Sequence, residues 1–172
     1  TRIRELQQNP FRFPHLTEQV DAVVMVGQHA MAGTFNAFID HTQCPKTLCR
    51  FKMNGVEYGE MGQFALYAGF YGVPLVHVSG DEALCDEAKR QFPHVITTAT
   101  KRGTGWETCE LYDVALVRQH IRRDVASALK HIDMSHAFTL PTPVEVEIEW
   151  GWSGKADPIA RVPGVTRVDA RT

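Results

Sequence analysis

Three short runs of apolar and β-branched residues, separated by helical patterns, constrain the fold of this chain most strongly. They cover residues 22–27, 74–78 and 95–99. Runs of this length that end at glycine, proline or aspartate are typical of buried parallel strands, and residues 22–27 resemble a central strand buried on both faces. Apolar residues recur at helical spacing over residues 61–71, and Asp81 is placed to cap a helix that extends to about residue 92. We therefore predict an α/β fold with a mainly parallel sheet flanked by helices.

A hairpin, a long helix and a last strand are predicted outside this alternating order. Asn54-Gly55 separates two strand-like segments, residues 46–53 and 56–58, and this dipeptide is a strong signal for an inserted β-hairpin. An amphipathic helix is expected at about residues 113–132, and strict alternation predicts a strand at residues 144–150.

The expected organisation has three parts. Residues 1–20 form an irregular N-terminal segment, residues 21–138 form the α/β core, and residues 139–172 form a C-terminal strand region. The boundary at residue 139 rests on a stretch that contains two prolines, Pro141 and Pro143, which is the best candidate for a hinge.

The charge and composition argue against several classes of partner. Eighteen Lys and Arg residues against twenty Asp and Glu residues give a net charge of −2 and a pI near 6.4. Without a basic excess, we expect no nucleic-acid partner and no attraction to an anionic membrane. No apolar run approaches the roughly 20 residues that cross a bilayer, and no secretory signal pattern is present. We expect a cytoplasmic protein whose four cysteines are reduced.

Three residues are candidates for chemistry, and each has an ordinary alternative. His29 follows the first predicted strand, where α/β sheets bind ligands, but a histidine at a strand end is more often a hydrogen-bonding loop residue. His41 follows Asp40, which either orients the imidazole or forms a solvated loop pair with it. Glu60 begins a predicted helix, where the helix dipole stabilises a carboxylate, or it is a metal ligand. The residues alone leave these alternatives open.

A series of short motifs nevertheless resembles one known family. The motifs are Gly27-Gln28-His29-Ala30-Met31-Ala32-Gly33, His41, Asn54-Gly55, Gly59-Glu60-Met61-Gly62, Tyr67-Ala68-Gly69-Phe70-Tyr71-Gly72-Val73-Pro74, Val78-Ser79-Gly80-Asp81 and Val95-Ile96-Thr97-Thr98-Ala99-Thr100-Lys101. In this order they resemble the zinc-dependent D-aminopeptidases of the dipeptide-operon (DppA) type, over roughly residues 21–111. The resemblance implies that the core of residues 21–138 is a metallopeptidase core.

The resemblance also implies a set of site residues. A two-zinc site is expected, with His29 as a ligand of one zinc ion and Glu60 as a ligand of the other. His41 is then the catalytic histidine, and Lys101 matches a family lysine near the active site and is expected to contact substrate. Imidazole and carboxylate are suitable zinc donors, and two zinc ions can polarise a carbonyl and lower the pKa of a bridging water.

The family's remaining zinc ligands have no counterpart in these 172 residues. They lie in an N-terminal part of the family, as an Asp-x-Glu on the first strand and a histidine near the end of a later strand. We expect a missing N-terminal segment or a separate chain to supply them, and we expect the C-terminal region to be truncated near Ala170. The resemblance further implies a homo-oligomer, a decamer in the family. Trp106 departs from the pattern, because family members often carry arginine there.

The leading hypothesis is a metal-dependent aminopeptidase that hydrolyses the amide bond after an N-terminal D-amino acid of short peptides. The alternative is a non-catalytic module that binds a peptide or small ligand on the same scaffold. Metal content separates the two, because the enzyme requires zinc and the binding module does not.

Overall fold

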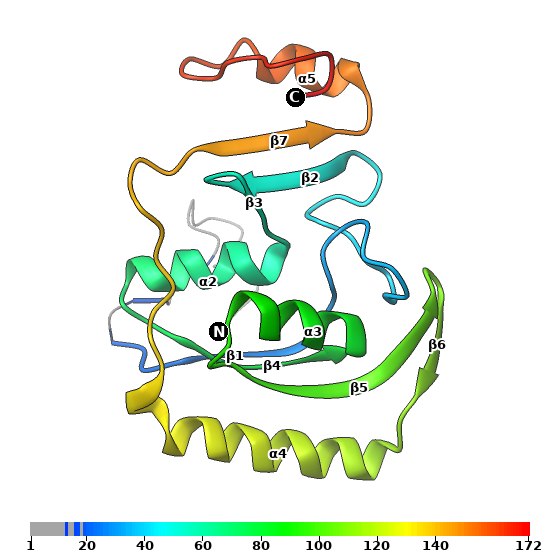
Figure 1. Cartoon of the computed structure of the whole chain (residues 1–172), viewed down its shortest axis with the longest axis vertical. Coiled ribbons are helices and arrows are strands. Elements are labelled where there is room, and N and C mark those ends of the chain that lie inside the picture. The colour runs from blue at the N-terminus through cyan, green and yellow to red at the C-terminus, as the bar shows by residue number, and fades with distance from the viewer. Residues whose placement is uncertain (1–12, 14–15, 18) are drawn as a thin grey trace, which may run out of the picture.

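The computed structural model describes residue 13, residues 16–17 and residues 19–172 of the chain. The remainder of the expected N-terminal segment lies outside the described residues. Figure 1 shows two sheets, with helices packed around the larger one. The strands are β1 (Val23–Gln28), β2 (Leu48–Met53), β3 (Val56–Glu57), β4 (Leu75–Asp81), β5 (Ile96–Gly105), β6 (Thr108–Leu111) and β7 (Val146–Trp150). The helices are α2 (Glu60–Phe70), α3 (Glu82–Gln91), α4 (Val114–Lys130), the 3-10 turn η1 (Ile132–Met134) and α5 (Ser153–Ile159).

The larger sheet has the strand order β1-β4-β5-β6. The pairs β1/β4 and β4/β5 are parallel, and β6 runs antiparallel to β5. Helices α2 and α3 lie on one side of this sheet and α4 lies on the other (Figure 1). All seven residues of β4 are buried between these layers. The predicted α/β fold with a mainly parallel sheet flanked by helices is confirmed.

Local sequence signals account for most of these elements. Asp81 caps α3 by accepting a hydrogen bond from the backbone N–H of Leu84, as expected. Helix α2 ends before Gly72, whose φ of 75° suits a residue without a side chain. The long helix predicted from residue 113 is α4. Among the described residues, no helix combines the length and apolar character needed to span a bilayer.

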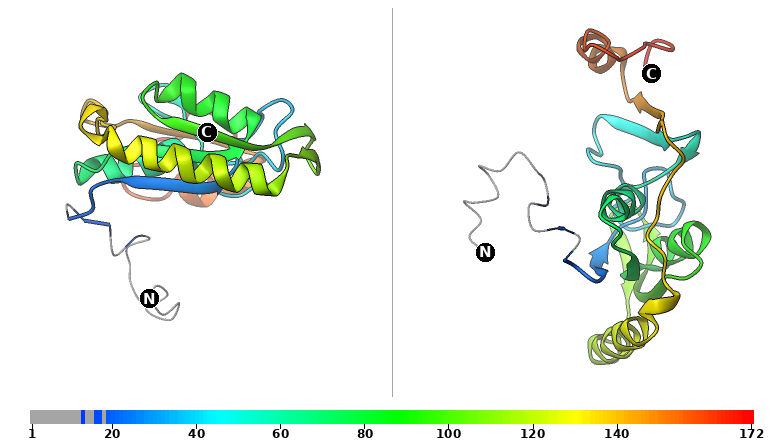
Figure 2. Two further views of the ribbon diagram at one scale, coloured as in Figure 1. Left: turned by 90° about the horizontal axis from the view of Figure 1, so that it is seen from below. Right: turned by 90° about the vertical axis from the view of Figure 1, so that its left-hand side faces the viewer.

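The position of β1 differs from the sequence prediction. Residues 22–27 were expected to form a central strand buried on both faces, but β1 is an edge strand of the described sheet. Val24 is 37% exposed and Val26 is 68% exposed. Helix α4 packs on β4 and β5, and Figure 2 (left) shows β1 beside α4 at the margin of the sheet. No described helix covers the face of β1 that carries Val24 and Val26, so these side chains are exposed. The apolar run of residues could not predict this, because it does not indicate which faces of a strand are covered.

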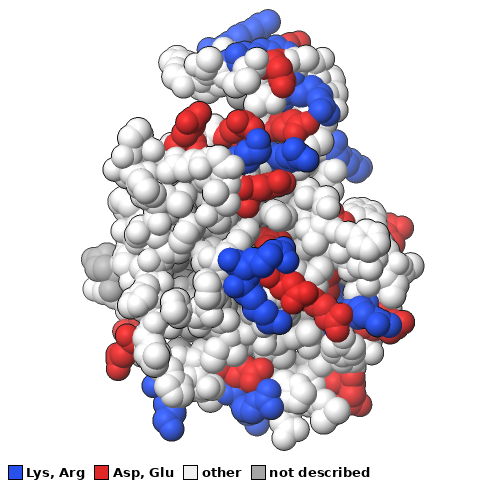
Figure 3. Space-filling model, in the orientation of Figure 1, with Lys and Arg blue, Asp and Glu red and all other residues white. Residues whose placement is uncertain are grey.

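The predicted hairpin is present and belongs to a second sheet. Asn54 and Gly55 have φ angles of 49° and 78°, the left-handed pair that a two-residue hairpin turn requires. Strand β7 then pairs antiparallel with β2, giving the order β3-β2-β7. Lys52 and Glu147 form an ion pair of 2.6 Å across β2 and β7. Figure 3 shows acidic and basic side chains intermixed over this sheet.

The hairpin of β5 and β6 was not predicted. Strand β5 continues six residues beyond Ala99, to Gly105, and β6 follows after a turn at Trp106 and Glu107. Residues of β6 are mostly exposed, so the strand lacks the apolar alternation that identifies a half-buried strand. This hairpin extends from the sheet to the loop between β1 and β2 (Figure 1), where the backbone N–H of Ile39 donates to the carbonyl of Trp106.

Candidate metal site

Two histidines and one glutamate that are distant in the sequence meet at the carboxyl end of β1. His29 directly follows β1, His41 lies in the loop of residues 29–47, and Glu60 is the first residue of α2. One ligand atom from each of the three residues lies within 4.8 Å of the others. All three side chains are partly buried. In the described part of the chain, this is the group of imidazole and carboxylate side chains that is placed to hold a metal ion.

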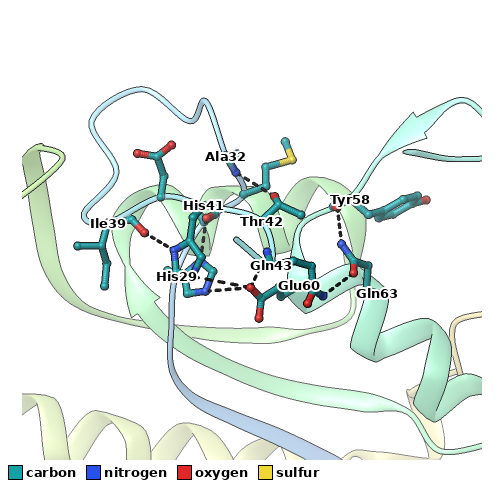
Figure 4. A network of polar contacts seen from close by, with 12 residues as sticks. His29, Ala32, Ile39, His41, Thr42, Gln43, Tyr58, Glu60 and Gln63 are labelled. Carbon is teal, nitrogen blue, oxygen red and sulfur yellow. Dashed lines mark hydrogen bonds and ion pairs between the residues drawn. The ribbon is translucent and has the colours of Figure 1, made fainter. Parts of the chain in front are cut away.

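The two imidazole rings lie beside the Glu60 carboxylate (Figure 4). His29 Nε2 and His41 Nε2 each lie 3.8 Å from Glu60 Oε1. The two imidazole rings stack with their centroids 3.6 Å apart and their planes inclined by 18°. Both Nε2 atoms thus face the same carboxylate oxygen.

The other ring nitrogen of each histidine is held by the backbone. His29 Nδ1 lies 3.0 Å from the carbonyl oxygen of Ala30, and His41 Nδ1 lies 2.7 Å from that of Ile39. A carbonyl only accepts a hydrogen bond, so it favours the tautomer with the proton on Nδ1. Each Nε2 then keeps a lone pair directed at the site, which is the arrangement usual for metal-binding and proton-accepting histidines.

Asp40 does not orient His41, although the sequence left that interpretation open. Its carboxylate instead accepts a hydrogen bond of 2.7 Å from the backbone N–H of Gly33. The partner of His41 Nδ1 is the carbonyl of Ile39. Asp40 therefore stabilises the fold of the loop, and the loop backbone orients the imidazole.

Glu60 begins α2, as expected, and its carboxylate also belongs to the three-residue cluster. It occupies the first turn of α2, where the helix dipole favours a negative charge. Its Oε1 also accepts a hydrogen bond of 2.8 Å from the backbone N–H of Gln43. The preceding residue must be small, because a Cβ on Gly59 would lie 2.7 Å from the Cβ of Met31. This close approach brings the start of α2 against the loop that carries both histidines.

Two buried carboxylates at α3 accept hydrogen bonds from the same loop, a role that no sequence pattern indicated. Asp81 Oδ2 accepts a hydrogen bond of 2.6 Å from the backbone N–H of Phe38. Glu87 Oε2 accepts one of 2.8 Å from the backbone N–H of Met31. Both residues are 1% exposed. The partners are 43 and 56 residues apart in the chain, so only the folded structure brings them together.

Burial changes the acidity of the Glu87 carboxyl group. It raises the pKa of Glu87 from 4.5 to about 7, since the hydrogen bond from Met31 offsets only part of the lost hydration of the carboxylate. Among the described residues, no hydrogen-bond partner is recorded for Oε1. Ionised Glu87 is therefore disfavoured in the folded protein relative to the unfolded chain.

We expect replacement of Glu87 by glutamine to remove a pH dependence of stability. In the native protein the folded-state pKa lies above the unfolded value, so stability is greatest below the unfolded pKa of about 4.5 and falls as pH rises through about 7. The loss amounts to about 3 kcal/mol at most. Glu87→Gln keeps the acceptor for Met31 and should be more stable than the native protein at about pH 8.5, with little difference near pH 5.

Urea unfolding at these two pH values measures this difference. Glu107→Gln is the matched control, because it removes an exposed carboxylate outside the loop contacts. A native protein whose stability does not decrease over this range would contradict the effect assigned to Glu87.

Lys101 lies near the loop and outside the three-residue cluster. It belongs to β5, and its Nζ lies 5.1 Å from the centroid of the Phe38 ring. Phe38 precedes His41 by three residues, so the ammonium group is held beside the loop that carries the site.

A cavity of about 390 Å³ borders the cluster on the side of Glu60. It is lined by Glu60 and by apolar, aromatic and amide side chains, namely Phe13, Met25, Gln28, Gln43, Gln63, Phe64 and Tyr67. A cavity of this size accommodates a small organic group, and glutamine side chains supply donors and acceptors for an amide.

The donor chemistry of the cluster fits zinc. Zinc binds imidazole nitrogen and carboxylate oxygen, and catalytic zinc sites use three protein ligands with one position left for water or substrate. His29, His41 and Glu60 provide two nitrogens and one oxygen. If His41 is kept for proton transfer, two donors remain, which are too few for a stable pair of ions.

Comparison with known proteins found a family match that covers most of the chain. Residues 10–172 match the model of the Peptidase_M55 family, described as D-aminopeptidase. A curated D-aminopeptidase of Bacillus subtilis (strain 168) is 28% identical over 149 residues, which cover 87% of this chain and 54% of the relative. The chain thus spans about half the length of this curated relative.

The fold is also similar to that of a solved protein. The structure described as "Zn-dependent D-aminopeptidase DppA from Bacillus subtilis, a self-compartmentalizing protease" superposes with a TM-score of 0.85. Its sequence is 25% identical, and the match covers 92% of this chain and 58% of that one.

Proposed function

Because this chain belongs to the Peptidase_M55 family of D-aminopeptidases, we propose that it forms part of a zinc-dependent aminopeptidase. The reaction is hydrolysis of the amide bond that follows an N-terminal D-amino acid in a short peptide. The observation that carries the proposal is the convergence of His29, His41 and Glu60 within 4.8 Å at one end of the sheet. The specificity for D-residues rests on the relatives, which are described as D-aminopeptidases.

His29 and Glu60 are proposed as zinc ligands, one for each of two ions. When bound, zinc supplies a Lewis acid for the scissile carbonyl and lowers the pKa of a bound water. The hydrogen bond from His29 Nδ1 to Ala30 keeps Nε2 available as a donor, and the N–H of Gln43 orients the Glu60 carboxylate. We propose that a missing N-terminal segment or a separate chain supplies the other ligands, and β1 is an edge strand of the described sheet beside which another strand could pair.

His41 is proposed as the catalytic histidine. Its Nδ1 proton is held by the Ile39 carbonyl, so its Nε2 lone pair can accept a proton from the attacking water. The same Nε2 can then deliver that proton to the leaving amine. The partly buried position of His41 limits competition from bulk water for its Nε2.

A short peptide is the proposed substrate, and Lys101 is proposed to contact it. The ammonium of Lys101 lies over the ring of Phe38, which is on the same loop as His41. The cavity beside Glu60 offers space for a small side chain or one peptide unit. A positively charged group suits a carboxylate or carbonyl oxygen of the substrate.

The proposed enzyme is a cytoplasmic homo-oligomer. The similar solved protein is described as a self-compartmentalizing protease, and the decamer is proposed from the family resemblance alone. Exposed apolar residues such as Phe70, which is 82% exposed, and Leu111, which is 74% exposed, are available for subunit contacts. Light scattering of the purified protein tests this assembly, and a monomeric mass would contradict it.

We expect the full-length protein to cleave D-alanine amide at least about 100-fold faster, in kcat/KM, than L-alanine amide. A factor of this size corresponds to about 2.7 kcal/mol of difference in transition-state binding. Release of ammonia from the two amides, compared at equal enzyme concentration, measures the ratio. Preference for the L-amide would overturn the stereochemical assignment, and cleavage of neither amide by zinc-loaded protein would overturn the proposed reaction.

A further inference from the structure

The turn between β5 and β6 is hydrogen-bonded to the loop residues directly before His41. The backbone N–H of Ile39 donates a hydrogen bond of 2.7 Å to the carbonyl of Trp106. The indole Nε1–H of Trp106 donates one of 3.1 Å to the carbonyl of Asp40. A single residue of the hairpin therefore binds the loop on both sides of the Ile39–Asp40 peptide bond.

Ile39 has a backbone conformation that requires such support. Its φ is 52°, in the left-handed region, which β-branched residues rarely adopt. The same residue supplies the carbonyl that lies 2.7 Å from His41 Nδ1. The direction of this carbonyl, and so the orientation of the imidazole, depends on Ile39 remaining in its disfavoured conformation.

The hairpin is fitted against this loop at a second point. A Cβ on Gly103 would lie 2.2 Å from the carbonyl oxygen of Asn36, so the backbones of β5 and the loop are in direct contact there. Trp106 is 50% exposed. Trp106 therefore contributes little to packing in the core. Its two hydrogen bonds are made instead to the backbone of the residues next to His41.

We propose that Trp106 is a positioning residue for His41. By holding Ile39 and Asp40, it keeps the Ile39 carbonyl on Nδ1 and leaves Nε2 directed at the site. The catalytic part of this inference rests on the proposed peptidase function. Its geometric part does not, because it concerns the position of the Ile39 carbonyl alone.

Two substitutions separate the indole N–H from the bulk of the ring. Trp106→Phe keeps an aromatic ring and loses the donor to Asp40, whereas Trp106→Arg keeps an N–H donor of similar reach. Trp152→Phe is the matched control, because Trp152 is 55% exposed and lies before α5, in the C-terminal region. The full-length protein is used throughout, and thermal unfolding checks that each variant folds.

Crystal structures of the variants give the first readout. In Trp106→Phe we expect Ile39 to leave the left-handed region and the distance from its carbonyl to His41 Nδ1 to exceed about 3.5 Å. His29 should keep its contact with Ala30, because the hydrogen bonds of Trp106 are made to Ile39 and Asp40. Trp106→Arg and Trp152→Phe should retain the native position of Ile39. Retention of the native Ile39 conformation in Trp106→Phe would overturn the proposal, as would an equal displacement of His29.

Kinetics with D-alanine amide give the second readout. Loss of a hydrogen-bond partner that orients a functional histidine lowers activity about tenfold or more. We therefore expect kcat of Trp106→Phe to fall about tenfold with KM nearly unchanged. Trp106→Arg should recover most of this loss. If no form of the protein cleaves the amide, the proposed function fails while the crystal structures still decide the positioning role. A normal kcat in Trp106→Phe with a displaced Ile39 carbonyl would overturn the catalytic part.

Discussion

Replacing His29 by alanine is expected to weaken zinc binding by the full-length protein at least about 100-fold. Zinc sites with four ligands bind with about 10–16 kcal/mol, so one ligand contributes about 3 kcal/mol. Peptidase activity should fall with the metal content. Metal analysis of protein purified without chelator, followed by zinc titration, measures the loss.

His120→Ala is the matched control for this experiment. His120 lies on α4, is exposed, and belongs to no described metal cluster. The control should retain the native zinc content and activity. If the native full-length protein holds no transition metal, the alternative of a non-catalytic binding module replaces the enzyme. If His29→Ala keeps its zinc, His29 is not a ligand.

Replacing His41 by alanine is expected to lower kcat by about 10²–10⁴ while zinc content stays unchanged. This is the usual contribution of a positioned acid–base group. The result distinguishes two interpretations that the geometry brings close together, because His41 Nε2 is as near to Glu60 Oε1 as His29 Nε2 is, at 3.8 Å each. Parallel measurement of kcat and bound zinc is therefore required.

Added imidazole sharpens the test of His41. If Nε2 of His41 only transfers a proton, free imidazole that enters the space left by His41→Ala should restore part of the rate. The same addition should not restore the activity of His29→Ala, since the loss in that variant comes from weakened zinc binding. Loss of zinc from His41→Ala would show that His41 is a ligand, and the catalytic role assigned to it would be wrong.

The secondary structure was predictable because its signals are local. Each signal involves only residues that are neighbours in the sequence. Examples are the apolar runs of β4 and β5, the capping carboxylate of Asp81 and the turn at Asn54-Gly55. The hairpin of β5 and β6 escaped prediction because β6 is short and mostly exposed. The burial of β1 was predicted wrongly, because an apolar run does not state what covers each face of the strand.

The candidate site was predictable only in part. His29 and Glu60 were each ambiguous by position, and the family resemblance, now supported by the match of residues 10–172 to that family, selected them as ligands. Their assigned roles remain proposals. Glu87 and Trp106 were not recognised as supports of the site, since each acts on backbone atoms of residues 31 and 39–40, far away in the chain.

The order of residues alone thus determined the class of fold, the positions of most strands and helices, and the chemical types available for a metal site. Only the tertiary structure decided that His29, His41 and Glu60 meet, that Ile39 is held in a left-handed conformation, and that buried Glu87 restrains the loop. The physical reason is the range of the interactions. Helix capping, turn geometry and hydrophobic periodicity operate over a few neighbouring residues, whereas ligand convergence and burial depend on contacts between segments separated by tens of residues.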